Sequence, residues 1–263
     1  MVMSGLLIGV LLARTVAGLL AETGTWRVVY FVAAASMLVQ GFILFHSLPT
    51  WKEDTRLGYP KLLLSVFELV KEEPLLRLRA AFGLLSFGTF SVLWTSMAFL
   101  LAHHYHYSEA VIGLFGLAGA AGAVTATVAG RMSDRRRARF STGVTTTLLL
   151  VSWAAMWAGG RDVAMLVVGV ILLDIGAQGL HITNQGEIYR LRPEARSRLT
   201  SAYMVTYFIG GAIGSATSAT VYGSFGWNGV CLVGALFAAL SSALWLFSFA
   251  PALKALDVAA TRT

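Results

Sequence analysis

The sequence predicts an all-α membrane protein with eight transmembrane helices. Of its 263 residues, 57% are hydrophobic and only 13% are charged, whereas a soluble domain carries about 25% charged residues. The apolar residues gather in stretches of about 20, the length that an α-helix needs to cross the hydrocarbon core of a bilayer. These stretches are continuous rather than alternating, which excludes the strands of a membrane barrel.

In chain order, the expected spans are 4–22, 27–47, 80–102, 109–130, 140–159, 162–185, 199–222 and 226–250. The longest connection, 48–76, separates the second span from the third. Pro49 and Pro60 interrupt it, and 59–73 is predicted to form a short amphipathic helix ended by Pro74. The apolar residues of this helix are expected on the cytoplasmic membrane surface: Leu63, Val66, Phe67 and Val70.

The basic residues are distributed unequally between the two sets of loops. One set holds most of the 20 Lys and Arg residues, including Arg79 just before the third span, whereas the opposite loops hold only Arg27 and Arg161. Because Lys and Arg are retained on the cytoplasmic side, both termini are predicted to be cytoplasmic. The net charge of +7 is therefore explained by basic residues that hold these loops in the cytoplasm. We expect no nucleic-acid partner.

The sequence offers little support for an enzyme. It contains no convincing nucleophile triad, phosphate loop or zinc motif, so we expect no catalytic residue, no cofactor and no metal site. His103, His104 and His106 cluster in an outer loop with Glu109 as the one nearby carboxylate, and we interpret them as a solvated loop. Cys231 is the single cysteine, which excludes a disulfide within the chain.

Ionisable groups within spans are costly in lipid and are therefore functional candidates. Arg14 lies about midway along the first span and Asp174 about midway along the sixth. Steps of four, three and four residues place a polar set on one face of the sixth span: Asp174, Gln178, His181 and Gln185. These residues are candidates for substrate contact, with Asp174 also a candidate for proton coupling. The alternative for Asp174 is a buried carboxylate paired with a neighbouring helix, and the alternative for Arg14 is a structural ion pair or a clamp on backbone carbonyls.

The third span adds Trp94 and Thr95 among several small hydroxyls. Such residues suit weak polar and stacking contacts with a small organic solute. The alternative is that each hydroxyl bonds a carbonyl of its own helix.

The loop after the fourth span has a recognisable motif. It reads Gly130-Arg131-Met132-Ser133-Asp134-Arg135-Arg136-Arg137-Ala138-Arg139 and resembles the signature loop of the major facilitator superfamily (MFS) of secondary transporters. Gly130, Asp134, Arg135 and Arg139 fit the family pattern, whereas Arg137 and Ala138 replace the usual glycine and basic residue. The resemblance implies that this loop is a conformational gate; the alternative is a cytoplasmic loop whose basic residues serve only to fix the orientation of the chain.

Two further segments are similar to bacterial sugar or drug efflux permeases of this family: Gly5 to Arg27, and Leu191 to Ser215. The resemblance covers essentially the whole chain and aligns it with spans five to twelve, with the first four spans missing. No proline precedes Pro49, so the Gly-Pro run typical of antiporters in span five is absent.

The resemblance implies an MFS-like fold with four regions. Residues 1–47 are the last two spans of the N-terminal bundle, 48–76 a cytoplasmic linker, 77–250 a complete C-terminal six-helix bundle and 251–263 a cytoplasmic tail. It also implies efflux of a small organic molecule by proton-coupled alternating access in the bacterial inner membrane. We expect a monomer, with lipid, solute and protons as its partners.

Two alternatives belong to a different functional class. The chain is either a truncated fragment that inserts in the membrane without transporting anything alone, or a complete eight-span scaffold. Four further spans encoded upstream would favour the transporter.

Overall fold

The computed structural model describes residues 9, 13, 15–21, 26–48, 59–118 and 138–260, and the regular structure in this part of the chain is helical throughout. The all-α class is therefore confirmed. The helices are α2 (Trp26–Ser47), α3 (Tyr59–Glu72), α4 (Pro74–His103), α5 (Glu109–Ala118), α7 (Ala138–Ala158), α8 (Val163–Ile188) and α9 (Arg196–Ala260), with a 3₁₀ turn η1 (Pro193–Ala195).

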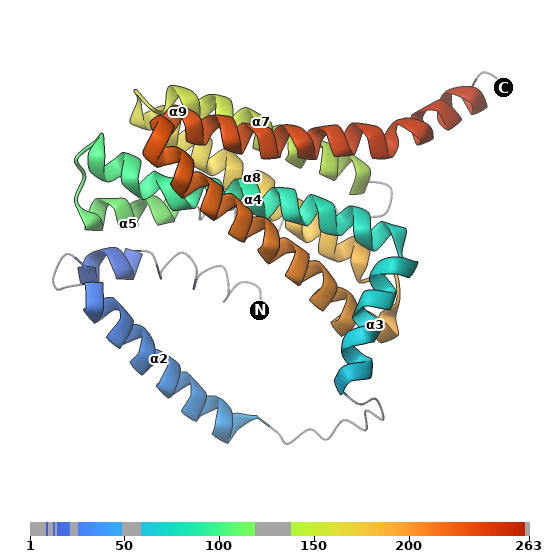
Figure 1. Ribbon diagram of the computed structural model, residues 1–263, viewed down its shortest axis with the longest axis horizontal. Coiled ribbons are helices and arrows are strands. Elements are labelled where there is room, and N and C mark those ends of the chain that lie inside the picture. The colour runs from blue at the N-terminus through green and yellow to red at the C-terminus, as the bar shows by residue number, and fades with distance from the viewer. Residues whose placement is uncertain are drawn as a thin grey trace.

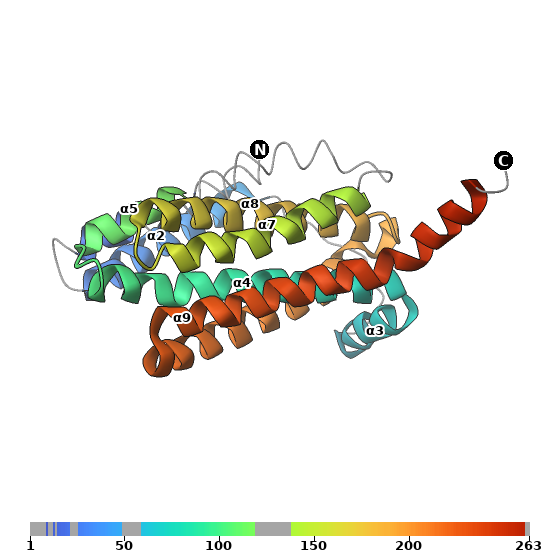
Figure 2. The same ribbon diagram turned by 90° about the horizontal axis from the view of Figure 1, so that it is seen from above.

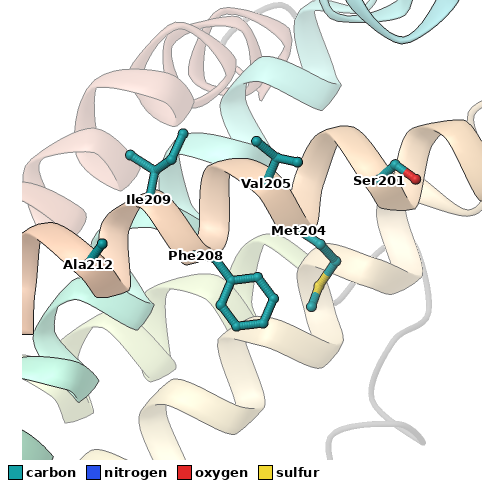
Figure 3. A pocket seen from close by; sticks show the side chains of 6 residues that line it. All are labelled: Ser201, Met204, Val205, Phe208, Ile209 and Ala212. Carbon is teal, nitrogen blue, oxygen red and sulfur yellow. The ribbon is translucent and has the colours of Figure 1, made fainter. Parts of the chain in front are cut away.

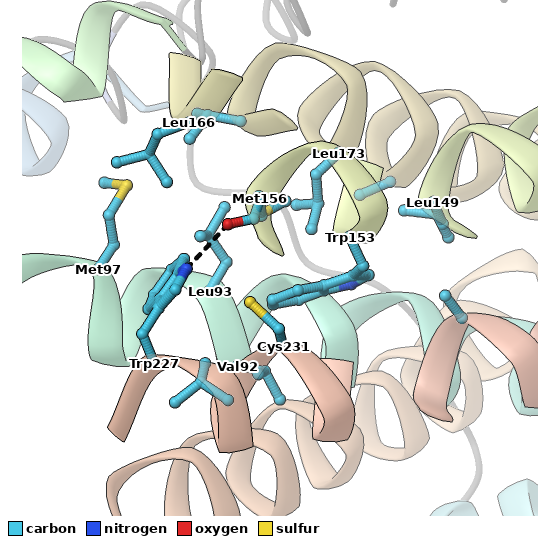
Figure 4. Close-up of a cluster of buried hydrophobic side chains, with 14 of the residues drawn as sticks. Val92, Leu93, Met97, Leu149, Trp153, Met156, Leu166, Leu173, Trp227 and Cys231 are labelled. Carbon is cyan, nitrogen blue, oxygen red and sulfur yellow. Dashed lines mark hydrogen bonds between the residues drawn. The ribbon is translucent and has the colours of Figure 1, made fainter. Parts of the chain in front are cut away.

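Helices α4, α7, α8 and α9 form a bundle around one large apolar core. α4 packs along α9 and against α8, while α7 packs against both α8 and α9 (Figures 1 and 2). The core includes Leu93 of α4, Trp153 of α7, Leu173 of α8 and Trp227 of α9 (Figure 4). The indole N–H of Trp227 donates to the Met156 carbonyl oxygen at 2.9 Å, so this buried ring also satisfies its polar atom.

Within the described residues, four helical segments are long and apolar enough to cross a membrane: Trp26–Ser47, Pro74–His103, Val163–Ile188 and Pro193–Ser248. α2 exposes Phe31, Leu38 and Phe45 by 74%, 76% and 84%, an apolar surface that suits lipid or another helix. The expected spans 4–22 and 109–130 lie partly outside the described residues. The number of eight spans therefore stays a prediction.

α7 corresponds to the expected span 140–159. Its hydroxyl side chains explain why it is less apolar than the four segments that are apolar enough to cross a membrane. Ser141, Thr142, Thr145, Thr146 and Ser152 are all buried. Each of the last four donates to a carbonyl oxygen three or four residues earlier in α7. Ser141 and Thr183 of α8 share a hydrogen bond of 2.9 Å. The polar groups of α7 are thus satisfied inside the protein, as an apolar environment requires.

The crossing of α4 and α9 depends on two glycines. A Cβ atom at Gly210 would collide with the carbonyl oxygen of Leu84, and one at Gly214 would collide with that of Gly88. The two backbones therefore touch without an intervening side chain, which is how membrane helices approach closely.

We predict that Gly214→Ala destabilises the protein, because the added methyl group meets backbone atoms that cannot move aside. The expected loss is about 1–3 kcal/mol of the free energy of unfolding, measured by denaturant titration in detergent micelles. Gly223→Ala is the matched control, since Gly223 also lies in α9 but has no atom within 4 Å of the added Cβ. Equal losses for the two variants would contradict the close-packing explanation.

Gly226 separates α9 into two arms. Its φ of 60° and ψ of −155° fall in a region that is essentially restricted to glycine. The arms on either side of this residue run in opposite directions (Figure 1). The expected loop between spans 199–222 and 226–250 is thus reduced to a turn at Gly226, because helix continues up to this residue on both sides.

α3 lies close to its expected bounds, and part of its apolar face packs on the bundle. Leu69 is buried, and Val66 and Val70 pack with it against a cluster that includes Ile188 and Tyr203. Within the described part of α3, Leu64 and Phe67 are the large apolar side chains left exposed. Leu69 thus docks α3 on the bundle, and the placement of the exposed side chains on the membrane surface stays a prediction.

Ion pairs hold the end of α3 against the loop that precedes η1. Arg192 donates to Glu73 at 2.7 Å and to Glu72 at 3.0 Å, and the hydrogen bond to Glu72 is the main cause that raises the pKa of the Arg192 guanidinium. Arg77 donates to the Val70 and Lys71 carbonyl oxygens, which have no partner within the helix. α3 is therefore fixed to the bundle at its C-terminal end.

We predict that Arg192→Gln loosens α3. Amide hydrogen exchange in α3 should accelerate roughly two- to fivefold, because the variant loses both ion pairs while the apolar contacts of Leu69 remain. Arg198→Gln is the control, since the Arg198 side chain makes no hydrogen bond or ion pair with the described residues. Unchanged exchange in Arg192→Gln would show that the apolar contacts alone hold the helix.

Candidate functional site

The predicted polar set of the sixth span lies on α8. Asp162 caps the start of this helix by accepting a hydrogen bond from the Ala164 N–H at 2.9 Å. Along one face of α8, Asp174 is buried, with 2% of its surface exposed, while Gln178, His181 and Gln185 are half-buried. We call these four residues the α8 polar face.

Asp174, at the N-terminal end of the α8 polar face, contacts Trp94, another residue predicted for the site. Trp94 of α4 donates from Nε1 to Asp174 Oδ1 at 3.3 Å. Two candidates predicted independently from two spans are therefore neighbours.

The lower part of the face is a small network. The Nδ1 atom of His181 lies 3.0 Å from the Tyr203 hydroxyl of α9, and its Nε2 atom lies 3.1 Å from Gln185 Nε2. The rings of His181 and Tyr207 are 4.7 Å apart. Both ring nitrogens of His181 thus have a polar neighbour.

Thr95 has a partner in the protein. Its hydroxyl donates to Ser215 Oγ of α9 at 2.9 Å. The neighbouring Ser96 shares a hydrogen bond of 2.6 Å with Ser218, which lies one turn after Ser215 in α9. Ser218 also donates to the Val92 carbonyl oxygen. The hydroxyls of α4 here connect α4 to α9, and the alternative of a bond within one helix is not what the structure shows for Thr95.

Several predicted residues lie outside the described residues: Arg14, Gly130, Asp134 and Arg135. Arg139 lies in the first turn of α7, where its carbonyl oxygen accepts a hydrogen bond from Trp245 Nε1 at 3.1 Å. The gate motif as a whole therefore stays a prediction.

Arg79 carries a buried charge that the pattern of basic residues did not predict. Arg79 was counted among the basic residues of a cytoplasmic loop, but it lies within α4 and only 2% of its surface is exposed. Its Nη1 atom donates to Thr142 Oγ1 of α7 at 2.9 Å and to Asn184 Oδ1 of α8 at 3.4 Å. Its Nη2 atom lies 3.7 Å from Glu187 Oε2. We call these four residues the Arg79 junction.

Arg79 is buried, rather than in a loop, because α4 is longer than the expected span. α4 begins at Pro74, well before the expected start at residue 80, so the turn that carries Arg79 is inside the bundle. Leu76 and Gly83 lie three residues before and four residues after Arg79 and are both buried. This helical spacing was the available signal, because Arg79 shares the face of buried neighbours.

Aromatic side chains were also missed. Phe87 stacks on Tyr207 of α9 with 4.1 Å between ring centroids, and it lies 5.7 Å from Phe90, which in turn lies 6.0 Å from Trp94. We call Phe87, Phe90 and Trp94 the α4 aromatic row. Their spacing of three and four residues was visible in the sequence. The stacking of Phe87 on Tyr207 was not, because these two residues are 120 positions apart in the chain.

The surface of α9 carries an open apolar hollow of about 550 Å³ (Figure 3). It is lined by residues of this one helix: Ser201, Met204, Val205, Phe208, Ile209 and Ala212. None of the predicted site residues belongs to it, and its lining offers one hydroxyl for polar contact. We therefore place the candidate site on α4 and α8. Among the described residues, no three His, Cys, Asp or Glu side chains converge as a metal site would require.

Comparison with known proteins identifies the class of this protein. The chain matches the family model of the Major Facilitator Superfamily over residues 1–140 and over residues 79–261. The chain belongs to this superfamily, whose members are transporters rather than enzymes, and it is a multi-pass membrane protein.

Individual relatives agree with this assignment. The chain is 51% identical over 249 residues to the putative uncharacterized transporter YgaY of Escherichia coli K12, which covers 94% of this chain and 63% of YgaY. It is 32% identical over 234 residues to the probable transporter SCO4007 of Streptomyces coelicolor, covering 88% and 54%. It is 27% identical to the inner membrane transport protein YnfM of Escherichia coli K12, covering 86% and 54%. The chain thus spans between half and two thirds of these relatives' lengths.

We predict that Glu187→Gln destabilises the protein more than Arg79→Met does. The side chain of Arg79 is 3% exposed and that of Glu187 is 15% exposed, so removing the carboxylate leaves the more deeply buried charge without a counterion. The expected cost of Glu187→Gln is about 3 kcal/mol in the free energy of unfolding. Adding Arg79→Met should recover part of this loss, because the stranded charge is then gone.

Denaturant titration in micelles measures all three variants. Arg190→Gln is the control, because Arg190 pairs with Glu187 at 3.3 Å but is 38% exposed, and it should cost less than about 1 kcal/mol. A double variant that is less stable than Glu187→Gln alone would contradict the role given to the buried charge.

Proposed function

We propose that this chain forms part of a secondary transporter that exports a small organic molecule, sugar or drug-like, in exchange for protons. The α8 polar face and Trp94 contact the solute, and Asp174 carries the proton. The observation that supports this most strongly is the buried carboxylate of Asp174, with 2% of its surface exposed and an indole N–H at 3.3 Å. A carboxylate within a membrane span is costly, so a functional reason for its presence is the default hypothesis.

The proposal extends to topology and conformational change. Most basic residues lie in one set of loops, which favours cytoplasmic termini in a bacterial inner membrane. Residues 1–47 and 77–250 act as parts of two bundles joined by the linker 48–76, which rock around the solute in alternating access. The loop motif with Gly130, Asp134, Arg135 and Arg139 gates this movement, and Arg14 is a further candidate for solute or proton contact.

A second candidate function rests on the exposure of α2. Within the described residues, α2 has no buried side chain. A protein that inserts in the membrane but transports nothing alone agrees with this observation. Reconstitution in liposomes separates the two functions.

We predict that Asp174→Asn abolishes solute-dependent proton movement. The chain is reconstituted in liposomes that contain a trapped pH dye, a pH gradient is imposed, and a panel of sugars and aromatic compounds is added. Asparagine keeps the shape and the acceptor for Trp94 but cannot exchange a proton, so the wild-type signal should disappear without loss of protein from the membrane.

Asp162→Asn is the matched control, because Asp162 is an exposed cap of the same helix and asparagine caps equally well. Its proton signal should equal that of the wild type. A full signal in Asp174→Asn would remove Asp174 from the coupling mechanism. No signal from the wild type with any solute would favour the non-transporting alternative.

A further inference from the structure

The α4 aromatic row and the α8 polar face lie side by side in antiparallel helices. At one end, Trp94 donates to Asp174 at 3.3 Å. At the other end, Phe87 stacks on Tyr207 at 4.1 Å, and the Tyr207 ring lies 4.7 Å from that of His181. Seven residues separate the two ends in each helix, so the rows have equal length and are joined at both ends.

This arrangement has defined dimensions. Seven residues of α-helix rise about 10 Å, which is about the length of a flat system of two or three fused rings. Phe87, Phe90 and Trp94 are half-buried, so part of each ring remains exposed. We call the area between the two rows the strip.

The two sides of the strip offer different chemistry. The α4 side offers the half-buried rings of Phe90 and Trp94, which favour stacked or edge-on contact with another aromatic ring. The α8 side presents the half-buried amides of Gln178 and Gln185, which donate and accept hydrogen bonds. A molecule that matches both sides has an aromatic body and polar groups along one edge.

A sugar fits this surface less well. It needs polar partners on several sides, but three of the α4 hydroxyls near the aromatic row are already hydrogen-bonded to protein. Thr95 donates to Ser215 at 2.9 Å, Ser96 bonds Ser218 at 2.6 Å, and Thr89 donates to the Gly234 carbonyl oxygen at 3.0 Å. Removing any of these bonds to bind a sugar hydroxyl would leave a buried group without its partner.

We propose that the strip binds a flat aromatic solute of two or three fused rings that carries hydrogen-bonding groups on one edge. The ring plane lies against Phe90 and Trp94, and the polar edge faces Gln178. This inference rests on the proposed function, in that α4 and α8 contact the transported solute, and it names the chemical class of that solute.

The test is direct binding by calorimetry, with the 263-residue chain in lipid nanodiscs and empty nanodiscs as the baseline. The probes are 2,7-dihydroxynaphthalene, its fully saturated counterpart decalin-2,7-diol, and glucose. We expect saturable binding of the dihydroxynaphthalene, at least tenfold weaker binding of the saturated diol, and no competition by glucose. Comparable affinity for the saturated diol, competition by glucose or no saturable binding would each overturn the proposal.

Variants locate the site. Phe90→Leu should weaken binding of the dihydroxynaphthalene about tenfold, because one stacking surface is lost. Phe99→Leu is the matched control: Phe99 is also on α4 but is 44% exposed and lies beside His103, away from the strip. Its affinity should stay within about twofold of the wild type. Equal effects of the two variants would overturn the placement.

A second variant does not depend on the core. Gln178 is half-buried, and Gln178→Leu should weaken binding of 2,7-dihydroxynaphthalene while leaving that of 2-methylnaphthalene unchanged, because the latter has no hydroxyl to lose a partner. Equal changes for both compounds would contradict the polar edge. Binding requires no gradient, so aromatic binding without Asp174-dependent proton movement would contradict only the proposed coupling. Proton-coupled sugar movement without aromatic binding would contradict only this inference.

Discussion

The buried charge of Arg79 constrains much of the bundle. Its guanidinium meets Thr142 of α7 and both Asn184 and Glu187 of α8, so three helices must keep their relative positions for this cation to stay satisfied. A charge in so apolar a setting is stabilised only by well-placed partners. Asn184 lies one turn from His181, and the orientation of the α8 polar face is thereby tied to the Arg79 junction. The junction positions the candidate site without belonging to it.

Packing in the rest of the bundle follows the same logic of satisfying polar groups where water is absent. Small residues let α4 and α9 touch at Gly210 and Gly214, and paired hydroxyls such as Ser96 and Ser218 bridge these helices. Such contacts replace the hydrophobic driving force that lipid does not supply between helices. The helices of the bundle are therefore held by short-range complementarity, while large apolar side chains such as Phe208 and Phe247 remain outside.

Much of this organisation could be predicted from local pattern. The apolar runs predicted the positions of α2, α7 and α8 within three residues, and Pro74 marked the break between α3 and α4. Helical spacing also grouped Asp174 with His181. Burial of Arg79 could not be read from a charge count, because counting treats each basic residue near a span as solvated. The stacking of Phe87 on Tyr207 depends on how α4 crosses α9, which no local pattern encodes.

The abrupt reversal at Gly226 has a consequence for biogenesis. With helix on both sides of one glycine, the two arms of α9 have no hydrophilic loop between them that could reach water while one arm waits in the membrane. The residues around the turn, Ser224, Phe225, Trp227 and Asn228, carry no charge. Moving this tip across the bilayer therefore costs little compared with moving a charged loop. The two arms are suited to enter the membrane together, as one hairpin inserted in a single event.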